Sequence, residues 1–191
     1  MINLDDYDIF KNNKDSLKEL SKDDSDPAHI VYMTESTVIA VDFDEVKRLY
    51  VNALGISEDN AYSVDGISHT DNAISFIEFK NGKVNNRNVK DKIRDSLLIF
   101  CDITNTDISY TRQNAEFVLV YNEDKNPLPN QYKKDIVQPS ASRTFISKRL
   151  AQMGKQEFIL FDLERYKKLY FKDVHTYSQE EFEEYVLKLR N

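Results

Sequence analysis

Residues 62–80 constrain the fold more than any other part of the chain. They form two runs of β-favouring residues, 62–68 and 73–80, separated by the polar residues 69–72. Apolar and β-branched residues favour strands, whereas a short cluster of polar residues with Asp and Asn favours a turn. The stretch therefore predicts a β-hairpin, and the rest of the chain has to be arranged around it.

Three ionisable residues of this hairpin are expected to meet at one end of the sheet. Side chains alternate along a strand, so Glu78 and Lys80 point to one face while Phe79 points to the other. Pairing of the two strands brings Asp65 to the same end. The simpler interpretation is an ordinary ion pair at a strand end, but a carboxylate inside the apolar run F-I-E-F-K normally needs a partner. Two carboxylates can bind a divalent cation, and an amine can orient water or stabilise a phosphate.

The order Asp65, Glu78, Lys80, with thirteen residues from the aspartate to the glutamate, resembles the motif of the PD-(D/E)XK nuclease superfamily. The resemblance covers residues 42–103 and includes a predicted helix on each side of the hairpin. It implies a restriction-endonuclease-like core and metal-dependent cleavage of phosphodiester bonds. The chain departs from the family pattern in having two predicted strands between the helices instead of three. It also has Val64 where the family has a proline.

The resemblance also implies a role for each residue of the motif. Asp65 and Glu78, together with the carbonyl of Phe79, would hold Mg²⁺ or Mn²⁺, and Lys80 would position the attacking water. Asp71 is an alternative acid seven residues before Glu78, although its place in the turn makes it a poorer ligand. The metal would polarise the phosphate and lower the pKa of the water.

A helix is predicted over residues 42–55, with Asp42 as N-cap and Glu45 three residues later in the manner of a capping box. By the resemblance Glu45 is a further candidate metal ligand, although capping explains it without a metal. The other predicted elements are a hairpin over 29–41, a helix from 88 to 100, a strand over 116–122, a long loop over 122–142, a helix over 144–153, a strand over 157–163, a short helix and turn over 165–177, and a terminal helix capped by Ser178 and Glu181.

Charge is unevenly distributed along the chain, whose formal net charge is −7. Residues 5–26 carry eight acidic residues against four lysines, whereas residues 80–94 and 143–172 each carry a net charge of +5. If the two basic stretches meet in space they can bind a polyanion; otherwise they are ordinary solvated helix faces. Lys90 and Arg94, in the first stretch, are the resemblance-based candidates for contacts with substrate phosphates.

These 191 residues, 40% of them hydrophobic, suffice for one core, and we expect a single α/β domain with a central mixed sheet flanked by helices. It spans residues 28–191 and follows an N-terminal helix or arm over 1–27. Cys101 is the only cysteine and lies in an apolar run, which predicts a buried thiol rather than a disulfide. With neither a run of roughly 20 apolar residues nor a signal peptide, the chain is expected to be soluble and cytoplasmic, with no membrane contact.

The leading function predicted from these features is metal-dependent cleavage of DNA or RNA, in bacterial or phage defence. Abundant Asn, Lys, Ile and Tyr with four glycines and no tryptophan are typical of a low-GC bacterial or phage coding sequence. The alternative is a non-catalytic binding protein on the same scaffold, such as a toxin-neutralising immunity protein or an antitoxin. A small acidic chain suits the basic surface of a toxic nuclease. The partner is a nucleic acid in the first case and a toxin protein in the second.

Overall fold

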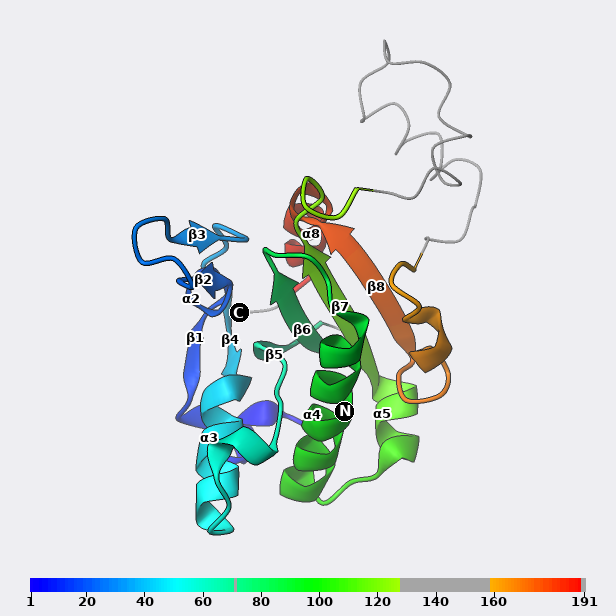
Figure 1. Cartoon of the computed structure of the whole chain (residues 1–191). Coiled ribbons are helices and arrows are strands. Elements are labelled where there is room, and N and C mark those ends of the chain that lie inside the picture. Colours follow the sequence, from blue (N-terminus) through cyan, green and yellow to red (C-terminus); the bar gives the residue numbers. More distant parts are fainter. Residues whose placement is uncertain (71, 128–158, 190–191) are drawn as a thin grey trace.

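A six-stranded mixed sheet forms the centre of the fold, with strand order β1-β4-β5-β6-β7-β8 (Figure 1). The computed structural model describes residues 1–70, 72–127 and 159–189. The strands are β1 (Lys14–Ser16), β4 (Ile39–Asp42), β5 (Gly66–His69), β6 (Ile74–Lys80), β7 (Ala115–Tyr121) and β8 (Asp173–Ser178). Neighbours from β1 to β6 are antiparallel, whereas β7 and β8 run parallel to β6. The predicted mixed sheet flanked by helices is confirmed.

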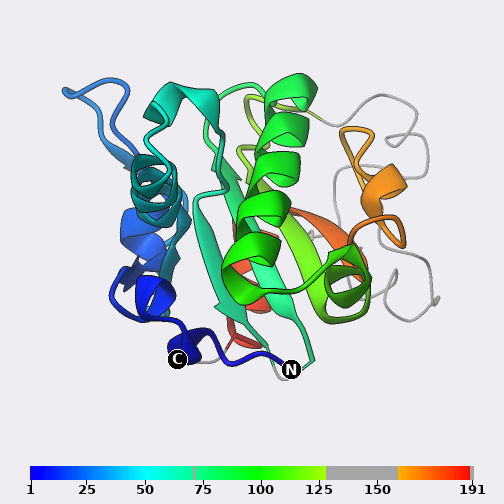
Figure 2. The same cartoon turned by 90° about the horizontal axis from the view of Figure 1, so that it is seen from below.

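Helices cover both faces of the sheet. Figures 1 and 2 show α3 (Phe43–Ala53), α4 (Asn86–Thr104) and α5 (Ile108–Asn114) on one face and α8 (Gln179–Val186) on the other. Shorter elements precede them: α1 (Asp8–Lys11), α2 (Leu17–Leu20), and a small second sheet of β2 (Lys22–Asp23) and β3 (Val31–Tyr32). None of the described helices has the length and apolar character needed to cross a membrane.

Two hydrophobic clusters lie on opposite faces of the sheet, and β6 contributes to both. On the face covered by α3 and α4, Phe76 packs edge-on against Phe43 and Phe100, with ring centroids 6.3 and 5.2 Å apart. On the other face, Phe79 packs edge-on against Phe182 of α8 at 5.4 Å. This alternation confirms that Phe79 points away from Glu78. Burial of many such rings is the main stabilising contribution of the sheet.

The central strands are close to those predicted. The hairpin over 62–80 forms as β5 and β6, with Ile67 opposite Phe76 and Ser68 opposite Ser75. The predicted strand over 116–122 is β7, which pairs on both sides and is buried along almost its whole length, as its continuous apolar run indicated. Between α3 and α4 there are two strands, as predicted, and their antiparallel neighbour β4 precedes α3. Cys101 is buried and free, as predicted.

Several predictions for the outer parts of the fold are wrong. The hairpin over 29–41 does not form, because β3 pairs with β2 while β4 pairs with β1 and β5. The segment 1–27 is neither one helix nor a free arm: it forms short elements, including the edge strand β1, and buries Phe10 and Leu17. Residues 159–163 form no strand, and the last strand is β8, which occupies the second half of the stretch 165–177 predicted as a short helix and turn and ends one residue beyond it. The helix predicted over 144–153 lies outside the described residues.

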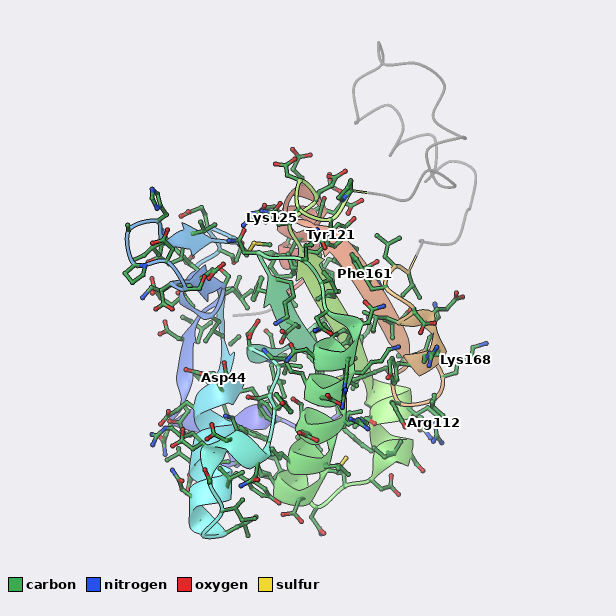
Figure 3. All side chains as sticks on the ribbon, in the orientation of Figure 1. Asp44, Arg112, Tyr121, Lys125, Phe161 and Lys168 are labelled. Atoms are coloured by element: carbon green, nitrogen blue, oxygen red, sulfur yellow. The ribbon has the colours of Figure 1, made fainter. Side chains whose placement is uncertain are left out.

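Segments near the end of the described chain pack along β7 and α5. The ring of Tyr121, the last residue of β7, meets the ring of Phe161 with centroids 5.2 Å apart (Figure 3). At the opposite end of the sheet, Nε of Arg112 in α5 donates to the backbone carbonyl of Leu169 at 3.2 Å. Figure 3 labels Arg112 and Lys168, the residue that precedes Leu169. The segment before β8 is thus held at both ends of the sheet.

Helix α8 begins with a complete capping box, as predicted. The side chain of Ser178 accepts from the backbone N–H of Glu181, and the carboxylate of Glu181 accepts from the backbone N–H of Ser178 at 2.8 Å. In α3 only half of the predicted box is present, since Asp42 accepts from the N–H of Glu45 while the Glu45 carboxylate pairs elsewhere.

Replacing Ser178 with alanine is expected to lower the free energy of unfolding by about 1 kcal/mol, because the backbone N–H of Glu181 loses the hydroxyl oxygen that accepts its hydrogen bond. Urea denaturation followed by circular dichroism measures the change. Ser57→Ala is a matched control, since Ser57 precedes a 3-10 turn without a side-chain capping bond. Equal losses in the two variants would contradict this role of Ser178.

Candidate functional site

The candidate site forms where β5 begins beside the end of β6. Gly66 pairs with Ile77, and the same register continued by one residue places Asp65 opposite Glu78. The backbone N–H of Phe79 donates to Oδ2 of Asp65 at 2.6 Å, which fixes this carboxylate at the strand end. Gly66 permits the close packing here, because a Cβ at this position would lie 2.9 Å from Leu20 Cδ1. The two acids of the predicted motif are therefore brought together.

Glu78 is fully buried and lies between two ammonium groups. Lys80 Nζ is 2.7 Å from its Oε1, and Lys92 Nζ is 2.9 Å from Oε1 and 3.0 Å from Oε2. Lys92 also donates to Oδ1 of Asp65 at 3.1 Å. Although these ion-pair distances are short, Oε1 of Glu78 accepts no hydrogen bond of acceptable angle within the described part of the chain. Asp65, Glu78, Lys80 and Lys92 form what we call the acid–lysine cluster.

The electrostatics of the acid–lysine cluster are dominated by burial. Removal from water, and after it the nearby negative charge of Asp65, raise the pKa of Glu78 from its ordinary 4.5 to about 7, against the opposing effect of the two lysines. Burial also raises the pKa of Asp65, against the opposing effect of Lys92. For Lys92, burial acts to lower the pKa, but the two carboxylates outweigh it and raise the pKa above its ordinary range.

Lys92 is the residue of the cluster that the sequence did not single out. It lies on α4 between Val89 and Ser96, at spacings of three and four residues, and these two neighbours are fully buried. Oγ of Ser96 accepts from the N–H of Val64 at 2.9 Å, which holds this face of α4 against the start of β5. Residues separated by three or four positions share one face of a helix. That spacing was the available signal for Lys92.

A third carboxylate, that of Asp44, lies near the acid–lysine cluster. Asp44 occupies the first turn of α3 (Figure 3) and accepts a hydrogen bond from the hydroxyl of Ser63. Its negative charge contributes to raising the pKa of Asp65. Glu45, the acid predicted for this role, instead pairs with Arg48, whose Nε lies 2.7 Å from its Oε2, and this hydrogen bond lowers the pKa of Glu45.

The two predicted phosphate-binding residues are paired with acids. Lys90 donates to Asp162 at 2.9 Å, and Arg94 pairs with Asp91 on the surface of α4. Asp162 also pairs with Arg165. Arg165 of the basic stretch 143–172 therefore lies near Lys90 of the basic stretch 80–94, with the acid Asp162 between them. Asp71 lies outside the described residues.

The donor set is one of oxygen atoms, which suits Mg²⁺ or Mn²⁺. Within residues 1–70, 72–127 and 159–189, no group of three or more His, Cys, Asp or Glu side chains is placed to hold a metal ion. A metal ion here would therefore rely on Asp65, Glu78 and backbone oxygens. The N–H and C=O of one strand residue point the same way, so the Phe79 carbonyl is directed toward Asp65 like its N–H.

Comparison of the chain with protein-family models, curated proteins and solved structures gives no match. The PD-(D/E)XK resemblance therefore depends on the residues of the motif themselves. What the structure adds is their placement, at the ends of two central strands of one sheet and within reach of each other's charges.

Proposed function

We propose that the protein is a metal-dependent nuclease that cleaves phosphodiester bonds of DNA or RNA in the cytoplasm and acts in bacterial or phage defence. One observation carries the proposal: the carboxylates of Asp65 and Glu78 converge on a single cation, the ammonium of Lys92, at 2.9 to 3.1 Å. A fully buried and a partly buried carboxylate that surround one positive charge form an arrangement able to hold a divalent cation as well.

In this proposal each residue of the acid–lysine cluster has a separate task. Asp65, Glu78 and the Phe79 carbonyl would hold Mg²⁺ or Mn²⁺, which when bound polarises the phosphate and lowers the pKa of a water. Lys80, whose side chain is 22% exposed, reaches solvent beside Glu78 and can orient that water or stabilise negative charge on the phosphate. Asp65 is also partly exposed, so a substrate can approach from this side.

The position of Lys92 sets a condition on metal binding. Its ammonium occupies the space between the two carboxylates, so a metal ion bound by both requires this side chain to move. Displaced toward solvent, the ammonium would lie near the phosphate that the metal polarises. Lys90 and Arg94 are already paired with acids. In that position Lys92, rather than these two residues, can neutralise the negative charge of the phosphate.

The test is calorimetric titration of Mn²⁺ into the wild type and into Asp65→Asn and Glu78→Gln, with cleavage of plasmid, single-stranded DNA and RNA assayed alongside. We expect wild-type binding in the millimolar range or tighter, lost in both variants. Cleavage is expected to fall at least about 100-fold in each variant and in Lys80→Met, since each loses a charged group arranged around the transition state.

Glu45→Gln is the matched control, because this acid lies on the neighbouring helix and pairs with Arg48 away from the acid–lysine cluster. It should leave metal binding and cleavage unchanged. Circular dichroism of every variant checks that the fold is retained. Metal binding that survives both Asp65→Asn and Glu78→Gln, or cleavage that needs neither acid, would contradict the proposal.

A second candidate is a non-catalytic binding protein on the same scaffold, such as a toxin-neutralising immunity protein or an antitoxin. The observation in its favour is that two lysines already neutralise the two acids, so the cluster is electrically complete without a metal. On this hypothesis the wild type neither binds Mn²⁺ nor cleaves nucleic acid, and Asp65→Asn leaves partner binding intact. The titration above therefore separates the two candidates.

A further inference from the structure

A shallow groove of about 460 Å³ lies between α3 and α4, away from the acid–lysine cluster. Its floor and rim come from the end of α3, the 3-10 turn Glu58–Asn60 and the second half of α4. The residues that line it are Tyr50, Val51, Leu54, Ile56, Asn60, Ala61, Asp95, Leu98, Ile99 and Asp102. We call it the α3–α4 groove.

Large apolar side chains are exposed along the α3–α4 groove. Leu98 is 65% exposed, Leu54 56% and Ile56 43%, and all three line the same depression. A single exposed apolar residue needs no explanation, but Leu54 and Ile56 at the end of α3 and Leu98 on α4 together give one depression an apolar lining. Such a surface is typical of a site that another molecule covers.

The rim of the α3–α4 groove is acidic. Asp95, Leu98 and Asp102 follow one another at spacings of three and four residues, so they share one face of α4. Asp95 accepts from the N–H of Tyr62 at 2.9 Å and Asp102 from the hydroxyl of Tyr50 at 2.8 Å. These donors are neutral, and the described residues form no ion pair with either acid, so both negative charges remain available.

Two further features strengthen this negative potential. Asp102 lies in the last turn of α4, where no basic residue offsets it and the helix dipole already places negative charge. The sequence also contains no lysine or arginine between Arg48 and Lys80, a stretch that includes Glu58 and Asp59 of the 3-10 turn. An acid at this end of a helix adds to the negative end of the helix dipole, so a cationic group bound here would be stabilised by both.

We propose that the α3–α4 groove binds a helical segment of a protein partner, with apolar side chains in the groove and Lys or Arg residues against Asp95 and Asp102. A nucleic acid would be repelled by this rim. A second copy of the chain related by two-fold symmetry would bring the same acidic rims together. The groove offers no unpaired strand edge, so a helix fits it better than an added strand. The inference does not depend on the proposed cleavage activity.

The test uses a synthetic amphipathic helical peptide with leucines on one face flanked by lysines, and a second peptide with glutamates in place of the lysines. Fluorescence anisotropy measures binding of each to the full chain, and ¹⁵N–¹H NMR locates the contact. The lysine peptide is expected to bind in the micromolar range with shifts confined to the groove. Leu98→Ser and the double variant Asp95→Asn/Asp102→Asn are each expected to weaken it about tenfold.

The asparagines keep the hydrogen bonds from Tyr50 and Tyr62 while removing the charge, so the double variant tests electrostatics alone. Leu187→Ser is the matched control: Leu187, directly after α8, is 86% exposed, and its loss should leave binding unchanged. The proposal is overturned if the lysine peptide does not bind, if the glutamate peptide binds equally, or if the shifts lie elsewhere. Sedimentation showing a dimer that Leu98→Ser dissociates would assign the groove to a second copy instead.

Discussion

Replacing Lys92 with methionine is expected to lower the free energy of unfolding by about 3–5 kcal/mol near neutral pH, the usual cost of removing one partner from a buried ion pair. The ammonium of Lys92 compensates two acids at once, Asp65 at 3.1 Å and Glu78 at 2.9 Å. Methionine fills much the same space without a charge. Glu78 would keep only Lys80, and Asp65 would lose its ion pair. Urea denaturation at constant pH measures the loss.

Lys90→Met is the matched control, since Lys90 lies on the same helix and pairs with an acid that is 52% exposed. Its loss should cost no more than about 1 kcal/mol. A second comparison adds Asp65→Asn and Glu78→Gln to Lys92→Met. This uncharged cluster should recover much of the lost stability, because no buried charge is left without a partner. An equal effect of the Lys90 and Lys92 variants would show that the acid–lysine cluster is not buried as the structure places it.

The core of the candidate site was predictable because it depends on local structure. The alternation of side chains along one strand fixes Glu78 and Lys80 on one face, and a hairpin brings its two strands together whatever surrounds them. Lys92 is different, because its contact with Glu78 depends on how α4 lies on the sheet, which no local pattern fixes. Its spacing from Val89 and Ser96 shows that it faces inward but not which acid it meets.

The errors in the outer strands have two physical causes. Residues 157–163 were predicted as a strand from their apolar run, but Phe161 and Asp162 adopt positive φ angles of 59° and 58°, which a strand cannot accommodate. The true last strand, β8, shows strand alternation instead, with Val174, Thr176 and Ser178 buried and their neighbours less so.

Partner choice among strands is the second cause. The run over 29–41 does contain strand residues, but β4 pairs with β1 and β5 rather than with β3. Pairing between strands distant in sequence is decided by the packing of the whole sheet. In the pairing of β4 with β5, for example, Val41 lies opposite Ile67, and both side chains belong to the hydrophobic cluster around Phe76. Strand propensity indicates where a strand lies but not which strand it meets.

The stability of the wild type is expected to fall by about 3 kcal/mol as pH rises from 4.5 to 7, because of Glu78. Its pKa is 4.5 when unfolded and about 7 in the folded protein. Between these values the folded state holds a proton that the unfolded state has released, so raising the pH favours unfolding. The raised pKa of Asp65 acts in the same direction, whereas the raised pKa of Lys92 matters only in the alkaline range.

Glu78→Gln should remove most of this slope, because glutamine does not titrate. The free energy of unfolding, measured by urea denaturation at several pH values from 4.5 to 8, gives the slope independently of any constant cost of the substitution. Glu45→Gln is the control: the pKa of Glu45 is lowered by Arg48, so its stabilising effect is lost only as pH falls below the ordinary range of glutamate. ¹³C NMR of the Glu78 carboxyl group gives its pKa directly. A wild type that gains stability from pH 4.5 to 7, or a slope that Glu78→Gln leaves intact, would place the titrating group outside the acid–lysine cluster.

If Glu78→Gln removes the slope, the negative charge of Glu78 lowers the stability of the fold at neutral pH. The same negative charge is the one that a divalent cation would bind. Binding of Mn²⁺ by Glu78 would then stabilise the folded protein more at pH 7 than at pH 5, since the ion binds only the ionised carboxylate.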